Sequence, residues 1–240
     1  MIQFFLIWFF LMPASPEYAW REQLSIQKLT DNTYIFTTWK TLNETTFPSN
    51  GIYIVADTGV IMIDTPWDTL QVEPLLDSIK KRHNKKVLYC IATHFHEDRT
   101  GGFDILKRKG IKTYSSLQTL QLCRNKNEKQ AQRYFKKDTV FTSGKILVET
   151  FYPGHGHTED NIVLWIKNEK ILYGGCFVKS IENNSLGNIA DANPEEWKKS
   201  LTKTIQKFPK PKYIIPGHFG WQSTKALKHT LKLIGKLLQQ

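Results

Sequence analysis

With 240 residues, the chain is long enough to bury one sizeable hydrophobic core. Hydrophobic residues make up 40% of it and charged residues 23%, as in ordinary soluble globular proteins, and the lack of low-complexity segments and helical repeats excludes repeat architectures. The net charge is +11, but the lysines are scattered along expected helices, so we interpret them as a solvated surface rather than a nucleic-acid site. Three cysteines do not make a disulfide framework.

Residues 2–12 (IQFFLIWFFLM) form a continuous apolar run that is too short to cross a membrane and typical of a signal-peptide core. Pro13, Ala14 and Ser15 then break the run and supply small residues. No Lys or Arg precedes the run and no A-x-A cleavage site follows it, so a buried N-terminal element and an uncleaved anchor stay open as alternatives. We predict a signal peptide at residues 1–19, export to the periplasm, and a single domain at residues 20–240.

In chain order, alternating or apolar runs predict strands at residues 33–38, 51–56, 60–64 and 86–92. A helix between residues 67 and 82 is indicated by apolar residues at i, i+3, i+4 and i+7: Val72, Leu75, Leu76 and Ile79. The second half predicts strands at residues 146–152, 162–166, 170–173 and 213–215. Two further helices are expected, one capped by Asn193 with Pro194 at its first position and one over residues 227–238, and Cys123 lies on another.

Strands followed by helices, twice along the chain, predict an α+β fold built as an αββα sandwich, with two packed sheets and helices on the outer faces. The chemistry-bearing residues begin where one buried strand ends. His94, His96 and Asp98 follow residues 86–92, and extended backbone would point residues i, i+2 and i+4 to the same side. This triplet alone is consistent either with a metal site or with a polar loop.

Three more strand ends carry metal-ligating side chains. His157 lies in the glycine-lined turn PGHGHT, Cys176 follows Gly174-Gly175, and His218 lies in PGHFG. Six such ligands are too many for one tetrahedral zinc, so they divide into two sites. Their mixture of imidazole, thiolate and carboxylate is typical of zinc.

The motifs HFHED, PGHGHTEDN, GGCFVKS, LGN and PGHFGW carry a family resemblance. From about residue 25 to the C-terminus, the sequence resembles a metallo-β-lactamase of the two-zinc subclass, which has a three-histidine site and an Asp-Cys-His site. The resemblance implies that the first zinc is held by His94, His96 and His157, and the second by Asp98, Cys176 and His218.

Arg99 separates this chain from other branches that share the fold. Thioesterases and nucleases of that fold have H-x-H-x-D-H, in which the last histidine is a ligand, whereas an arginine cannot ligate a metal. Those branches also bridge the metals with an aspartate where this chain has Cys176. Both differences favour the β-lactamase subclass.

The resemblance assigns roles to residues beyond the ligands. Lys179 matches the lysine that binds the substrate carboxylate, and Asn188 matches the asparagine near the lactam carbonyl, although residues 180–184 leave the register of that loop open. Asp64 and Arg99 are expected to contact and orient metal ligands, with an N-cap as the equal alternative for Asp64.

Residues 38–50 correspond to the family's mobile flap, with apolar contacts to substrate from Trp39, Leu42 and Phe47; hydrophobes packed under a long hairpin are the alternative. Trp67 is expected in the core and His155 is expected not to be a ligand. The helical histidines His83 and His229 are expected at the surface.

The expected function is hydrolysis of the β-lactam amide bond in penicillins, cephalosporins and carbapenems, which gives antibiotic resistance. Zinc lowers the pKa of bound water to about 7, so a zinc-bound hydroxide oriented by Asp98 would attack the lactam carbonyl beside Asn188. The alternatives are a thioesterase or lactonase on the same fold and a non-catalytic periplasmic zinc-binding protein. We expect two zinc ions, a small-molecule substrate, no nucleic acid, no stable membrane partner unless the leader is uncleaved, and a monomer.

Overall fold

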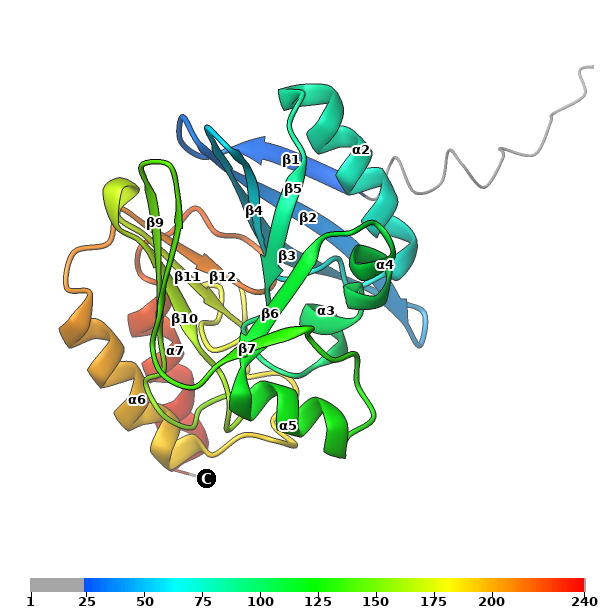
Figure 1. Cartoon of the computed structure of the whole chain (residues 1–240). Coiled ribbons are helices and arrows are strands. Elements are labelled where there is room, and N and C mark those ends of the chain that lie inside the picture. The colour runs from blue at the N-terminus through cyan, green and yellow to red at the C-terminus, as the bar shows by residue number, and fades with distance from the viewer. Residues whose placement is uncertain (1–23, 240) are drawn as a thin grey trace, which may run out of the picture.

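The computed structural model describes residues 24–239, in which two β-sheets pack face to face between two layers of helices (Figure 1). The signal peptide predicted at residues 1–19 lies outside the described residues. Within them the first sheet contains, in this order, β1 (Leu24–Lys28), β2 (Thr33–Leu42), β3 (Thr45–Ala56), β4 (Gly59–Ile63), β5 (Val87–Ile91), β6 (Lys112–Ser116) and β7 (Arg133–Phe135). The second sheet has the order β12 (Tyr213–Pro216), β11 (Ile171–Gly175), β10 (Val163–Ile166), β9 (Ile146–Phe151) and β8 (Val140–Ser143).

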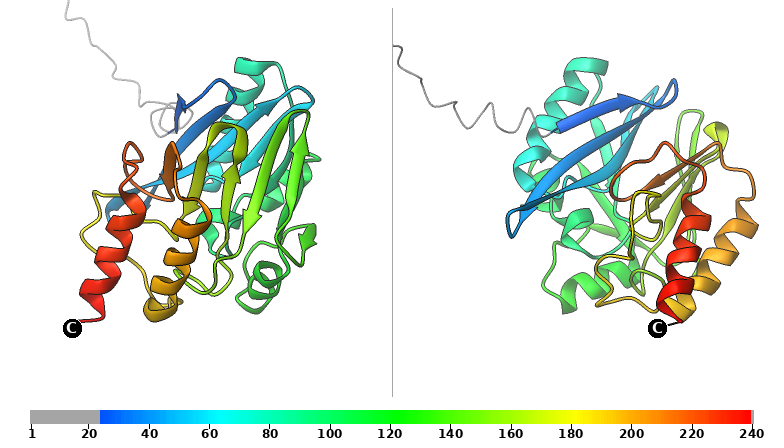
Figure 2. Two further views of the ribbon diagram at one scale, coloured as in Figure 1. Left: turned by 90° about the vertical axis from the view of Figure 1, so that its left-hand side faces the viewer. Right: turned by 180° about the vertical axis from the view of Figure 1, so that it is seen from behind.

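Each sheet is covered on its outer face by helices. The first half of the chain supplies η2 (Thr69–Gln71), α2 (Val72–His83), α3 (Glu97–Thr100), α4 (Phe103–Arg108) and α5 (Leu117–Asn125). The second half supplies η3 (Lys167–Glu169), α6 (Pro194–Lys207) and α7 (Ala226–Leu237). Figure 2 shows α6 and α7, in orange and red, side by side against the second sheet and on the side away from α2. The predicted αββα sandwich is therefore confirmed.

The layers follow from the alternation of side chains along each buried strand. In β4, Ile61 and Ile63 join the core between the two sheets, whereas Val60 and Met62 join the core beneath α2 and α4. Successive strand residues point to opposite faces, so a strand buried on both faces is apolar throughout. This is why the run over residues 60–63 is continuous in the sequence rather than alternating.

The segment predicted as a flap is a regular β-hairpin. Strands β2 and β3 pair in register from Thr33↔Ile54 to Leu42↔Thr45. Asn43 and Glu44 form the two-residue turn, with φ of 45° and 67°, the left-handed conformation that such tight hairpins require. The strands predicted at residues 33–38 and 51–56 are thus the inner parts of one longer ribbon that projects beyond the sandwich.

Strands β1, β6, β7 and β8 were not predicted, because each is short or carries many polar residues. The predicted helix over residues 67–82 starts late, since residues 69–71 form a 3₁₀ turn before α2. The cap that Asn193 provides to α6 is confirmed, as its side chain accepts a hydrogen bond from the Glu196 N–H.

Four strand ends meet at one edge of the sandwich and position the site. The chain leaves β4 at Asp64 and β5 at Ala92, and the neighbouring ends of β11 and β12 precede Cys176 and Gly217. Backbone hydrogen bonds join the sheets here, from Asn50 N to Gly217 O at 2.8 Å and from Ile162 N to Thr93 O at 2.9 Å. Loops from both sheets therefore converge on a rigid frame.

Candidate metal centre

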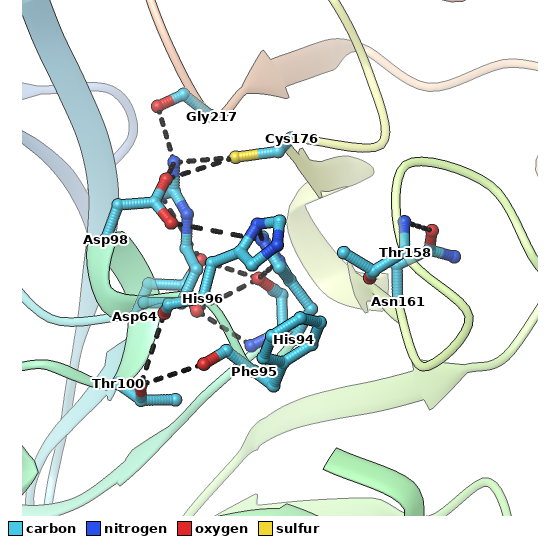
Figure 3. A network of polar contacts seen from close by, with 12 residues as sticks. Asp64, His94, Phe95, His96, Asp98, Thr100, Thr158, Asn161, Cys176 and Gly217 are labelled. Atoms are coloured by element: carbon cyan, nitrogen blue, oxygen red, sulfur yellow. Dashed lines mark hydrogen bonds and ion pairs between the residues drawn. The ribbon is translucent and has the colours of Figure 1, made fainter. Parts of the chain in front are cut away.

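Three histidines from two different loops face one another at this edge. The ring centroids of His94, His96 and His157 are 4.9 to 5.1 Å apart in all three pairs. The Nε2 atom of His94 lies 3.2 Å from Nδ1 of His96, as seen in the centre of Figure 3. The three imidazoles thus surround a common point, as the ligands of one metal ion do.

Burial prepares these imidazoles for ligation. It lowers the pKa of His94 and of His157 well below the usual value, and neighbouring positive groups act in the same direction. Both rings are therefore neutral at pH 7, the state in which imidazole binds a metal. Among the described residues, the buried Nδ1 atom of His157 has no hydrogen-bond partner.

A second group of ligands lies beside the first. The Sγ atom of Cys176 is 3.3 Å from Oδ2 of Asp98 and 3.2 Å from Nε2 of His218, and that Nε2 is 3.0 Å from the same Oδ2. Nδ1 of His218 donates to the Pro48 carbonyl at 2.7 Å, which leaves Nε2 directed at the other two ligands. The carboxylate of Asp98, the thiol of Cys176 and the imidazole of His218 thus form one compact group.

The charges in this second group are already arranged for a cation. Burial alone would raise the pKa of Asp98, but the Arg99 guanidinium and the His218 hydrogen bond outweigh it and hold that pKa well below the usual range. Burial raises the pKa of the Cys176 thiol to about 12, against the opposing effect of Arg99. Asp98 is therefore ionised, while Cys176 would lose its proton on metal binding.

The two groups are adjacent parts of one centre. His94 shares a cluster with His157 and Cys176 and another with His96 and Asp98, with all donor atoms of each cluster within 4.8 Å of one another. Imidazole, thiolate and carboxylate donors at this spacing fit one or two divalent transition-metal ions.

The sequence model of the metallo-beta-lactamase superfamily matches residues 45–218. The chain belongs to this superfamily. "Metallo-beta-lactamase type 2" from Elizabethkingia meningoseptica is 39% identical over 91% of this chain and 88% of its own length. "Metallo-beta-lactamase IND-1" from Chryseobacterium indologenes is 34% identical over 98% of both. Among solved structures, a metallo-beta-lactamase from Pontibacter korlensis is similar with a TM-score of 0.86 and 35% identity, covering 89% of this chain and 99% of that one.

Arg99 is the wholly buried cation of this metallo-β-lactamase centre. Its guanidinium lies 2.8 Å from Oδ2 of Asp98 and 3.0 Å from Sγ of Cys176, and it donates to the backbone carbonyls of Asn50 and Gly217 at 2.8 and 3.0 Å. It therefore holds a carboxylate, a thiol, strand β3 and the loop after β12 together. Arg99 thus contacts Asp98 and Cys176, two of the candidate metal ligands.

Asp64 lies behind the candidate ligands and is not a helix cap. Its carboxylate accepts from the Thr93 backbone N–H and from the Tyr173 hydroxyl, each at 2.7 Å. The Thr93 hydroxyl lies 3.2 Å from Nδ1 of His94, so Asp64 acts on that histidine through Thr93. The cap before α2 belongs to Asp68, which accepts from the N–H of Leu70 in η2.

The backbone at Asp64 has φ of 61°, a left-handed conformation that short polar side chains adopt more readily than bulky ones. Burial raises the pKa of Asp64 to about 6, and Arg99, Tyr173 and Thr93 oppose that rise. The same carboxylate thus ties β4 to the loop after β5 and to β11.

Asp191 is a site residue that the sequence did not reveal. Its Oδ2 atom lies 3.0 Å from Nε2 of His96, and its Oδ1 atom is 3.4 Å from the Lys126 ammonium. The contact orients the His96 ring, with Nδ1 toward the centre. No local spacing connects two residues 95 positions apart, so only the folded chain shows this pair.

A cavity of about 450 Å³ opens beside the metal centre. Its walls include Lys179, Asn188, Leu42 and Phe47, all expected near substrate, and also the candidate ligands His96, Asp98, His157, Cys176 and His218. Lys179 is buried, and burial lowers the pKa of its ammonium, which Cys176 and Asp98 partly offset. Asn188 is exposed on the loop, where its Oδ1 accepts from the Ala190 N–H at 3.1 Å.

Two tryptophans differ from expectation. Trp39 is not among the residues that line the cavity, because side chains three positions apart on a strand point to opposite faces and Leu42 takes the cavity side. Trp67, expected in the core, is only partly buried and lines the cavity instead. Its ring meets His218 edge-on with centroids 5.6 Å apart, because residues 64–68 turn along the rim before η2 begins.

The remaining histidines lie away from the two ligand groups. His155 is 3.0 Å from the Asp191 carbonyl and is absent from the ligand clusters of the described chain. His83 was expected at the surface, but it is partly buried, with Nε2 3.1 Å from the Tyr53 hydroxyl. Nε2 of His229, also partly buried, lies 2.8 Å from the Asn183 carbonyl. Both helical rings face the packed side of their helix.

Proposed function

We propose that this hydrolase opens the amide bond of β-lactams with the help of two zinc ions. The observation that carries the proposal is the buried Lys179, whose ammonium lines the same cavity as the two ligand groups. Among residues 24–239 the Lys179 ammonium has no carboxylate partner, and a metal centre beside such a cation fits a substrate that carries both an acyl group and a carboxylate.

The first zinc would be held by His94, His96 and His157, and the second by Asp98, Cys176 and His218. The neutral imidazoles, the ionised Asp98 and the close Cys176–His218 contact support this assignment. When bound, zinc supplies a Lewis acid and lowers the pKa of bound water to about 7.

The other side chains have distinct tasks. Lys179 pairs with the substrate carboxylate; the Trp197 ring, whose centroid is 5.4 Å from the ammonium, supports the side chain from behind. The side-chain oxygen of Asn188 accepts a hydrogen bond from the Ala190 N–H, so its amide nitrogen is free to donate a hydrogen bond to the lactam carbonyl. Asp98 accepts hydrogen bonds from the attacking water and orients it.

The hairpin excludes water from the substrate. Leu42 and Phe47 lie near its tip on the cavity side, and Trp67 also lines the cavity. These apolar surfaces would cover the fused rings of a β-lactam and leave its polar groups to the metal centre.

We also propose that the chain is exported and acts as a monomer. Export is supported by the apolar run and the small residues after it, and no helix among residues 24–239 is long and apolar enough to span a membrane. The monomer is supported by the six metal ligands and Lys179, which all come from one chain.

The test is hydrolysis of a chromogenic cephalosporin by the purified chain, before chelation, after chelation and after return of zinc, with bound zinc measured alongside. Activity that disappears on chelation and returns as two zinc ions bind would support the proposal. A thioester and a lactone serve as comparison substrates. Folded protein with two zinc ions that leaves the cephalosporin intact would overturn it, and turnover of a comparison substrate would then identify the thioesterase or lactonase alternative.

A further inference from the structure

The cavity beside the metal centre contains carboxylates whose surroundings differ sharply. Glu97, Asp98 and Glu128 all line it. Glu97 forms an ion pair with the Lys40 ammonium at 2.5 Å. Asp98 pairs with Arg99 at 2.8 Å and with His218 at 3.0 Å. The charges of these two are therefore already compensated by the protein.

Glu128 has no such compensation. It is partly buried in the loop after α5, and its carboxylate makes no hydrogen bond or ion pair with any residue in the range 24–239 that the structure describes. The ammonium of the adjacent Lys129 pairs with Asp104 instead, at 3.5 Å. Burial raises the pKa of Glu128 and the neighbouring Glu97 carboxylate raises it further, while His96 and Lys129 partly oppose that rise. Glu128 thus adds a negative charge without a directly bonded partner to the cavity wall.

The cavity also contains a positive charge, the Lys179 ammonium, which is supplied by the second sheet. Lys179 follows β11 of the second sheet, whereas Glu128 follows the helix that packs on β6 and β7 of the first. Within the described chain, the Lys179 ammonium has no hydrogen-bonded or ion-paired partner; its one aromatic contact is with Trp197. The cavity therefore presents one unpaired cation and one unpaired anion from different walls.

This pairing matches the chemistry of a zwitterion. Bicyclic β-lactams carry their carboxylate on the fused ring and their variable side chain on the far side of the four-membered ring. Lys179 and Glu128 line the same cavity, so a substrate whose carboxylate is bound by Lys179 can place its variable side chain near Glu128. A positive charge on that side chain would meet the one cavity carboxylate that the protein leaves unpaired.

We infer that Glu128 is a specificity-determining residue that favours β-lactams with a cationic side chain over those with an anionic side chain. The inference rests on the proposed function, since it concerns the substrate preference of that same site. Glu97 is less suited to this task, because Lys40 neutralises it and also lies 5.7 Å from the centroid of the Trp67 ring.

A matched series of three penicillins tests the inference. Ampicillin, benzylpenicillin and carbenicillin share a phenylacetamido side chain whose α-carbon carries an ammonium, a hydrogen or a carboxylate, respectively. The zinc-loaded wild type is compared with Glu128→Gln and Glu128→Lys, and the readout is the ratio of kcat/KM for ampicillin to that for carbenicillin. Glu73→Gln removes the same charge from α2, where Glu73 pairs with Lys109 away from the cavity, and serves as the control.

A partly exposed charge pair changes binding a few-fold. Glu128→Gln removes both the attraction for the ammonium of ampicillin and the repulsion of the carboxylate of carbenicillin. The ratio of kcat/KM for ampicillin to that for carbenicillin should therefore fall about tenfold. Glu128→Lys should lower it further, and Glu73→Gln should leave it at the wild-type value. A ratio that stays within about twofold of wild type in both Glu128 variants, while all three penicillins are hydrolysed, would overturn the inference alone. Failure of the zinc-loaded wild type to hydrolyse any of the three would overturn the proposed function and the inference together.

Discussion

The burial of Asp160, which is not one of the candidate metal ligands, predicts how the stability of the protein depends on pH. Asp160 lies in the loop between β9 and β10 and is completely buried. Neither of its carboxylate oxygens makes a hydrogen bond of normal geometry with a described residue. Burial raises its pKa from 3.8 to about 6, and the nearby Thr119 and Thr158 only partly offset that rise. The ionised form is thus poorly accommodated in the native state.

The sign of the effect follows from proton linkage. Because the folded pKa lies above the unfolded one, the favourable contribution of protonated Asp160 is complete below about pH 4 and is lost as the pH rises through about 6. At 1.36 kcal/mol per pKa unit, the full loss is about 3 kcal/mol by pH 8, and somewhat less than half of it falls between pH 5 and pH 8. The amide introduced by Asp160→Asn cannot ionise and lacks this dependence.

The assay is urea unfolding of the wild type and of Asp160→Asn at pH 5 and pH 8, followed by tryptophan fluorescence. Chelator is present throughout, so that metal binding does not contribute its own pH dependence. We expect the free energy of unfolding of the variant, relative to wild type, to increase by about 1 kcal/mol from pH 5 to pH 8. A relative stability that is the same at both pH values within about 0.4 kcal/mol would refute the reasoning.

Three further substitutions test the centre and its surroundings. Cys176→Ser replaces a soft ligand with a poor one, so zinc titration should show one of the two sites weakened by at least about tenfold and the other kept; two unchanged sites would contradict the assignment. Arg99→Ala leaves buried Asp98 without its main counter-charge and should cost about 3–5 kcal/mol in urea unfolding of the chelated protein, with a smaller loss for Arg99→Lys. Lys179→Met should raise KM for a cephalosporin about tenfold or more with little change in kcat, whereas Lys179→Arg should retain most of the affinity. Equal KM values for Lys179→Met and Lys179→Arg would exclude carboxylate binding by this residue.

Much of the fold could be read from the sequence because its signals are local. The apolar run of β4 and the i, i+3, i+4, i+7 spacing of α2 each lie within one element, and burial on both faces or on one face produces them directly. The polar strand β6 has no such signal, because it is held by pairing with β5 and β7 rather than by its own side chains. It was accordingly missed.

The metal-binding candidates were also within reach of the sequence. The His94–Asp98 cluster, His157, Cys176 and His218 each follow a strand or lie in a glycine-lined turn, and their side-chain chemistry taken together indicates a metal. The folded chain then brings them into two adjacent groups.

Contacts between distant segments were decided by tertiary structure alone. Asp191 contacts His96, which is 95 positions away in the sequence. Glu128 has no ion-pair partner among residues 24–239, while the adjacent Lys129 pairs with Asp104. The hairpin register, not residue type, puts Leu42 at the cavity and Trp39 away from it. The sequence by itself thus determined which groups can bind metal and how each strand and helix forms, since those depend on neighbours along the chain. Which charges are compensated and which side chains line the cavity depend on neighbours in space, and only the packing of the two sheets decides them.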